Sequence, residues 1–202
     1  MRKTRLLALD VDGTLLTDEL QITSATRKAI RQVISRGVKV VLTSARGPNA
    51  LYSIMADLEI TGLAICYTGA LTCRLYPEKP NSVEIVDEKP MSLTSAHFVL
   101  NNALEREISI GWFSSEKWYT LKYDLAIYHE SMITGVTPIV APDLLHKKHP
   151  PHKLQAIVEE PAHSPRLVAL ANSLPDDCVG QFSYETYLEI IHRGVDKSSA
   201  LP

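Results

Sequence analysis

The stretch of sequence that decides the fold is Leu6-Leu7-Ala8-Leu9-Asp10-Val11-Asp12-Gly13-Thr14-Leu15-Leu16. Its opening apolar residues predict a short buried strand, and two acids, a glycine and a threonine follow at once. Because side chains alternate along a strand, Asp10 and Asp12 should point the same way where the strand leaves the sheet. Two neighbouring carboxylates repel each other, so a divalent cation or a retained proton must hold them together. An aspartate-rich turn is the ordinary alternative, but this run directly after a buried strand favours a reaction centre.

The segments that follow alternate between helical and extended patterns. They predict a helix between Thr23 and Gly37, a strand over 38–42, a helix from Pro48 to Leu58, and a strand over 63–67. Strands that alternate with helices in this order pair in parallel through right-handed crossovers. Open sheets of this kind bind ligands beyond the carboxyl ends of their strands.

A second candidate position is Ser44, which follows the second predicted strand. A hydroxyl group there, just before the N–H groups of a helix, suits a phosphate oxygen. Taken alone, Ser44-Ala45-Arg46 would be an ordinary helix cap. Its position one crossover after Asp10 favours a phosphate-binding site instead.

The run that contains Asp10 resembles the nucleophile motif of the haloacid dehalogenase superfamily, whose members are mostly phosphatases. The larger pattern resembles the Cof-type sugar-phosphatase branch of that superfamily. The resemblance implies that Asp10 attacks phosphorus and that Asp12 protonates the leaving oxygen and later activates water. It also implies a Mg²⁺ ion held by Asp10, by the backbone carbonyl of Asp12 and by a third acid further along the chain.

Three further runs carry the resemblance. Ser44-Ala45-Arg46 matches a Thr-Gly-Arg motif, in which Arg46 would face the phosphate or hold the loop. Gly69 lies in a Thr-Gly-Ala run where the branch has Asn-Gly-Ala, and the resemblance makes it a phosphate-binding residue. Residues 194–201 resemble Gly-Val-x-Lys-Gly-x-Ala-Leu, so Lys197 would neutralise the transferring phosphoryl group and Asp10.

The resemblance implies an α/β fold in which an incomplete, Rossmann-like parallel core sheet carries an inserted α+β cap domain. The mixed strand and helix patterns after residue 80 fit such a cap. We therefore expect residues 1–79 and 188–202 to form the core and residues 80–187 to form the cap.

The fourth motif of the family, a strand ending in Gly-Asp-x-x-x-Asp, does not occur in residues 1–202. Without that strand, the Asp10 strand would be an exposed edge through which the chain could self-associate. Two interpretations stay open: part of a complete phosphatase, or a natural short form that binds a phosphorylated ligand or a partner without catalysis.

Composition narrows the class of protein. A net charge of −2 over 202 residues lacks the excess of positive charge that is typical of proteins that bind nucleic acid. No apolar run is long enough to span a membrane. Three cysteines without a Cys-x-x-Cys pair are unlike a disulfide framework and suggest a reduced cytoplasm. The sequence therefore predicts a cytoplasmic, Mg²⁺-dependent phosphatase acting on a small phosphorylated metabolite such as a sugar phosphate, or else a non-catalytic phosphate-binding protein on the same scaffold.

Overall fold

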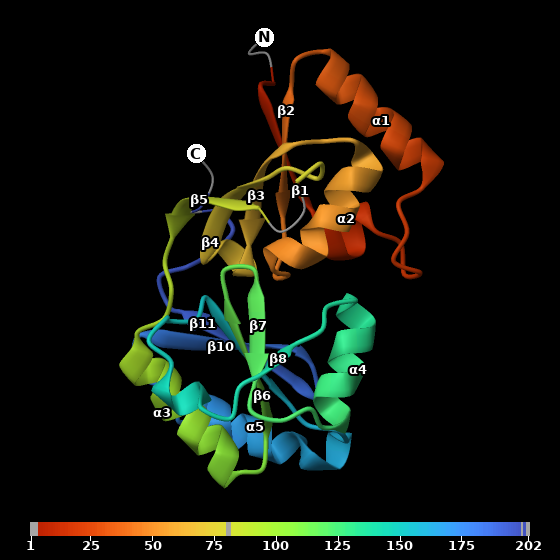
Figure 1. Ribbon diagram of the computed structural model, residues 1–202. Coiled ribbons are helices and arrows are strands. Elements are labelled where there is room, and N and C mark those ends of the chain that lie inside the picture. Colours follow the sequence, from red (N-terminus) through yellow and green to blue (C-terminus); the bar gives the residue numbers. More distant parts are fainter. Residues whose placement is uncertain (1–3, 80–81, 199, 201–202) are drawn as a thin grey trace. The chain divides into compact units, whose positions relative to one another are not determined.

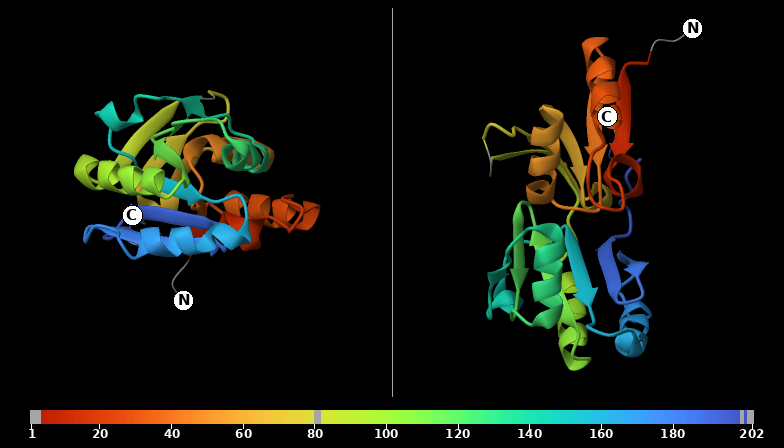
Figure 2. Two further views of the ribbon diagram at one scale, coloured as in Figure 1. Left: turned by 90° about the horizontal axis from the view of Figure 1, so that it is seen from below. Right: turned by 90° about the vertical axis from the view of Figure 1, so that its right-hand side faces the viewer.

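A computed structural model describes residues 4–79, 82–198 and 200 of the chain. The chain divides into two compact units, one formed by residues 1–88 and 196–202 and the other by residues 89–195. In Figures 1 and 2 the first unit runs from red to yellow and ends in the blue C-terminal segment, and the second runs from yellow-green to blue. Each unit has its own sheet.

The first unit is built on a five-stranded mixed sheet. Its strands, in spatial order, are β1 (Leu6–Asp10), β2 (Lys39–Thr43), β3 (Gly62–Cys66), β4 (Leu71–Leu75) and β5 (Val83–Glu88). The first three strands pair in parallel, as the sequence predicts, whereas β4 and β5 pair antiparallel. Within the described residues β1 pairs only with β2, so it lies at the edge of this sheet.

Two helices make the crossovers between the parallel strands: α1 (Ser24–Ser35) and α2 (Pro48–Leu58). The hydroxyl oxygen of Thr23 accepts a hydrogen bond from the Thr26 amide and caps α1, while Pro48 opens α2 at the position where a missing N–H costs nothing. Right-handed crossovers place both helices on one face of the sheet. An ion pair between Arg27 of α1 and Asp57 of α2 holds the helices side by side.

The α2 helix is well buried, but α1 is not. The apolar residues of α2 that recur at i, i+3, i+4 and i+7 are buried: Leu51, Ile54, Met55 and Leu58. On α1, Ile30 is buried but Ile34 is 37% exposed. The parallel core therefore packs mainly through α2.

The second unit is built on a six-stranded sheet with the order β10-β11-β9-β6-β7-β8. Its strands are β6 (Ser109–Ser114), β7 (Lys117–Thr120), β8 (Ile139–Val140), β9 (Lys153–Ile157), β10 (Cys178–Tyr184) and β11 (Tyr187–His192). All neighbouring strands pair antiparallel except β7 and β8.

Helices cover both faces of this second sheet. The helices α3 (Leu93–Glu105) and α5 (Ser164–Ala171) pack against Leu154 and Ala156 of β9 in the larger apolar core. The helix α4 (Leu125–Thr134) packs against Ile157 in a smaller cluster. Because successive side chains of a strand point to opposite faces, α4 covers the face opposite α3 and α5. This α+β layer is the expected inserted unit.

The boundaries between the units differ from those predicted at residues 80 and 187. The strand β5 pairs with β4 over its length, so residues 82–88 belong to the first unit. The strand β11 pairs with both β9 and β10, so residues 188–192 belong to the second unit. Both differences arise from strand pairing between distant segments, which local patterns do not reveal.

Candidate active site

Three loops at the carboxyl ends of the strands in the first sheet carry most of the predicted site residues. Asp10 is the last residue of β1, Ser44 follows β2 directly, and the turn that contains Gly69 follows β3. Asp10 pairs in register with Thr43, the residue before Ser44. Since the three strands are parallel, their carboxyl ends meet at the same edge, where open α/β sheets bind ligands.

The chain after Asp10 makes an irregular helical turn over Val11–Leu15. Gly13 has a φ of 72°, a left-handed backbone conformation that residues other than glycine rarely adopt. Val11 and Leu15 are buried on either side of Asp12 and fix the turn to the core. The polar residues of the turn therefore stay at the surface, while its apolar residues anchor it.

Asp10 and Lys197 form an ion pair in which Lys197 Nζ lies 2.5 Å from Asp10 Oδ1. The two residues are 187 positions apart in the chain, and each side chain is 38% exposed. The Asp196 carboxylate accepts a hydrogen bond from the Ser198 amide at 2.8 Å and shapes the segment that carries Lys197. Ser199 and Leu201 of the predicted motif lie outside the described residues.

Asp12 is paired with a different cation. The Arg46 guanidinium donates to both Asp12 carboxylate oxygens, from Nη2 to Oδ1 at 2.7 Å and from Nε to Oδ2 at 3.2 Å. The hydroxyl of Ser44, a residue only 1% exposed, donates to Asp12 Oδ2 at 3.5 Å and accepts from the Arg46 amide at 3.0 Å. Of the two roles left open for Arg46, this structure has it holding the Asp12 loop.

Gly69 lies close to the main chain of Asp196, the residue before Lys197. It belongs to a turn in which Tyr67, Thr68 and Gly69 all have positive φ. The sequence marks only Gly69 as a residue suited to such a backbone, so it gave no signal for the other two. The structure thus joins the Gly69 turn to the Lys197 segment.

The donors for a magnesium ion are present only in part. The resemblance assigns the carboxylate of Asp10 and the carbonyl of Asp12, and oxygen donors of this kind suit Mg²⁺. Within residues 4–79, 82–198 and 200, no three His, Cys, Asp or Glu side chains form a group that could hold a metal. One carboxylate and one carbonyl fit an ion that completes its shell with water and phosphate oxygens.

The three cysteines are buried and free. Cys66 Sγ and Cys73 Sγ lie 3.9 Å apart on neighbouring strands of the first sheet. Burial raises the pKa of the Cys66 thiol well above its usual value. Since the thiolate is the reactive form, this thiol is unsuited to act as a nucleophile.

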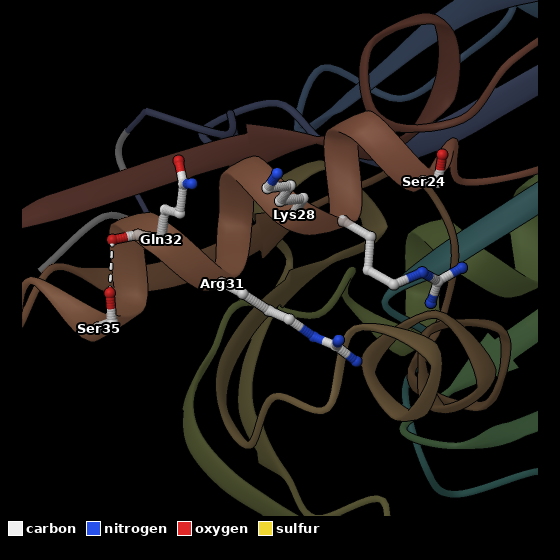
Figure 3. Close-up of a pocket in the computed structure, with 6 residues that line it drawn as sticks. Ser24, Lys28, Arg31, Gln32 and Ser35 are labelled. Carbon is white, nitrogen blue, oxygen red and sulfur yellow. Dashed lines mark hydrogen bonds between the residues drawn. The ribbon is translucent and has the colours of Figure 1, made fainter.

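Another hollow, of about 620 Å³, lies along α1 (Figure 3). It is lined by Ser24, Arg27, Lys28, Arg31, Gln32 and Ser35. Two of its basic side chains are in ion pairs, Arg27 with Asp57 and Arg31 with Glu59. None of the predicted site residues lines this hollow.

None of the described helices combines the length and the apolar character that a bilayer-spanning segment requires.

Comparison with known proteins agrees with the fold and with the resemblance to the family. The family model for haloacid dehalogenase-like hydrolases matches residues 7–202. The protein YxeH of Bacillus subtilis is 25% identical over 98% of this chain and 73% of its own length. An HMP-PP phosphatase of Yersinia enterocolitica is 26% identical over 98% of this chain and 70% of its own. The crystal structure of a haloacid dehalogenase-like hydrolase from Bacteroides thetaiotaomicron superposes with a TM-score of 0.83 at 21% identity, covering 98% of this chain and 74% of that one. The chain belongs to the haloacid dehalogenase-like hydrolase family.

Proposed function

We propose that the protein is a phosphatase that hydrolyses a small soluble phosphomonoester through a phosphorylated Asp10. The observation that carries the proposal is the ion pair in which Lys197 Nζ lies 2.5 Å from Asp10 Oδ1. A second ion pair, between Arg46 and Asp12, lies in the adjoining loops. Two carboxylates, each matched to its own cation at the end of a strand, supply a nucleophile and a proton carrier. Family membership and the HMP-PP phosphatase relative support this reaction class.

In the first step, a carboxylate oxygen of Asp10 attacks phosphorus, and the bond between phosphorus and the leaving oxygen breaks. Asp12 enters this step in its protonated form, and its carboxyl proton passes to that oxygen, so the product leaves as an alcohol. Covalent catalysis of this kind divides one difficult displacement into two easier ones. A positioned acid contributes about 10²–10⁴ in rate.

In the second step, water attacks the phosphorus of the acyl phosphate, and the Asp12 carboxylate takes up its proton. Inorganic phosphate leaves and Asp10 is regenerated. Lys197 stabilises the negative charge that accumulates on the transferring group, and the Ser44 hydroxyl is placed to bind one of its oxygens.

A Mg²⁺ ion held by Asp10 and the Asp12 carbonyl would neutralise part of the phosphate charge. We propose a sugar phosphate or a similar small metabolite as the substrate class, on the resemblance to the sugar-phosphatase branch. The buried free thiols support a reducing compartment, which we take to be the cytoplasm.

The alternative is a non-catalytic protein that binds a phosphorylated ligand on this scaffold. It is favoured by one observation: among the described residues, no three His, Cys, Asp or Glu side chains form a group that could hold a metal. Such a protein would bind phosphate or vanadate but would not turn over a phosphomonoester.

The deciding experiment replaces Asp10 by Asn, which is nearly isosteric but cannot form an acyl phosphate. Hydrolysis of p-nitrophenyl phosphate and of sugar phosphates should disappear, with the fold unchanged by circular dichroism. Borohydride trapping followed by mass spectrometry should locate the phosphorylated residue at position 10 in the parent protein.

Asp18→Asn makes the same change at an exposed aspartate nearby and should leave turnover unchanged. An Asp10→Asn variant that keeps activity within about tenfold of the parent would overturn the nucleophile assignment. Tight vanadate binding by a parent protein without turnover would instead support the non-catalytic alternative.

A further inference from the structure

The turn after β3 has an unusual backbone. Tyr67, Thr68 and Gly69 have φ values of 51°, 58° and 107°. Residues other than glycine seldom adopt positive φ, and here two of them precede a glycine. Conformations of this kind persist only where the surrounding structure imposes them, and they cluster at functional sites. The contacts of the turn show what imposes its shape.

On one side, the turn is bonded to the loop after β2. The Tyr67 amide donates to the Arg46 carbonyl at 3.1 Å, and the Thr68 amide donates to the Ser44 carbonyl at 3.0 Å. The Ser44 amide in turn donates to the Ile65 carbonyl at 2.9 Å. The two loops are therefore joined through their main chains, and the turn has a fixed place relative to Ser44 and Arg46.

On the other side, Gly69 lies against the segment that carries Lys197. A Cβ atom at Gly69 would overlap the carbonyl oxygen of Asp196 and would lie 2.8 Å from its carbonyl carbon. It would also lie 3.4 Å from the Cβ of Ala200. Because the obstructing atoms are main chain, no side-chain rotation could make room. Only glycine allows Asp196 and Ala200 to come this close.

We propose that Gly69 is a positioning residue for Lys197: its missing side chain lets the Asp196 main chain pack against the turn, which brings the Lys197 ammonium to Asp10. The sequence resemblance gave Gly69 a direct role in phosphate binding. The structure assigns it an action through Lys197 instead. The inference rests on the proposed function, since it concerns the cation that acts on the phosphoryl group.

The test compares Gly69→Ala with Lys197→Ala, measuring kcat, KM and the inhibition constant of vanadate. Vanadate mimics the charged phosphoryl group that a fixed cation stabilises. Both variants should lower kcat and weaken vanadate inhibition, by about 10²-fold if Lys197 acts as a fixed charge donor. In the double variant the Gly69 change should cost little more, because the cation that it positions is already gone.

Gly37→Ala is the matched control, since Gly37 has a φ of 78° but no atom within 4 Å of its missing Cβ. It also places an alanine at a positive φ but without the steric overlap, and it should keep the parent kcat and vanadate inhibition. If Gly69→Ala does not fold, Ala200→Val enlarges the same contact from the other side. That variant should also weaken vanadate inhibition, by a smaller factor than the one expected for Gly69→Ala.

The outcomes separate the inference from the proposed function. If Lys197→Ala itself keeps parent kinetics, the proposed role of Lys197 is wrong and the inference is wrong with it. If Lys197→Ala is impaired while folded Gly69→Ala, or Ala200→Val in its place, keeps parent vanadate inhibition, the inference alone is overturned. The inference would also be overturned if the losses of kcat in the two single variants multiplied in the double variant, because the two residues would then act independently.

Discussion

The guanidinium group of Arg46 spans the carboxylate of Asp12, with Nη2 2.7 Å from Oδ1 and Nε 3.2 Å from Oδ2. Two-point pairing of this kind fixes the orientation of a carboxylate as well as its charge. Asp10, two residues earlier, pairs instead with Lys197. Separate cations thus offset the repulsion between neighbouring acids that the sequence alone leaves unresolved.

Replacing Arg46 by Ala should impair the orientation of Asp12 rather than the binding of substrate. We expect kcat to fall by about tenfold, less than the 10²–10⁴ that a lost general acid costs, because Asp12 itself remains. Arg46→Lys keeps the charge but not the planar fork, so its kcat should lie between those of the parent and the Ala variant. A raised KM with unchanged kcat would show that Arg46 binds the substrate phosphate instead.

Replacing Asp12 by Ala should lower kcat by about 10²–10⁴ on a sugar phosphate. The loss should be smaller on p-nitrophenyl phosphate, because its leaving oxygen is weakly basic and needs little help from an acid. Asp12→Asn keeps the shape of the side chain and should show the same dependence on the leaving group. Equal losses on both substrates would mean that Asp12 only orders the loop.

Magnesium affinity provides a third test. Among the described residues, the assigned donors are the Asp10 carboxylate and the Asp12 carbonyl, and no group of three potential side-chain ligands occurs. A polypeptide of residues 1–202 should therefore bind Mg²⁺ only in the millimolar range, and chelation should abolish any turnover. Isothermal titration calorimetry with Asp10→Asn as the control measures this affinity. Micromolar affinity in the parent would require a further ligand from within these residues.

The meeting of these three loops was predictable because it depends on local motifs and a simple topology. Consecutive parallel strands place Asp10, Ser44 and the Gly69 turn at one sheet edge, and each motif follows its strand directly. The partner of Arg46 was not predictable, because the same side chain could reach either the phosphate or Asp12. The contact between Gly69 and Asp196 joins segments more than a hundred residues apart and leaves no local pattern.

The second unit shows where periodicity fails as a guide. The α4 helix buries Glu130 while Leu125 and Met132 are 51% and 67% exposed. A pattern of apolar residues therefore does not identify the buried face of this helix. Gln155 on β9 and Tyr187 on β11 supply polar partners for Glu130 on this buried face, and such partners become visible only once the sheet is assembled.

Glu130 is 6% exposed and faces polar groups from two strands of the second sheet. On β9, the Gln155 amide donates to its carboxylate at 3.2 Å, and Lys153 contributes a positive charge. On β11, Glu189 contributes a negative charge and the Tyr187 hydroxyl donates a hydrogen bond. Burial has the largest effect and raises the pKa of Glu130; burial together with Glu130 raises the pKa of Tyr187 to about 12.

The folded state therefore binds the Glu130 proton more tightly than the unfolded state does. Its contribution to stability is fully present below the unfolded pKa of about 4.3 and is lost as pH rises through the higher folded pKa. Glu130→Gln carries no titrating proton, so its stability relative to the parent should rise as the pH increases above about 4.3. Urea unfolding followed by tryptophan fluorescence measures this in the second unit, which contains both tryptophans of the chain, Trp112 and Trp118. The exposed Glu105→Gln should show no such trend, and a stability difference for Glu130→Gln that stays constant across this pH range would contradict the prediction.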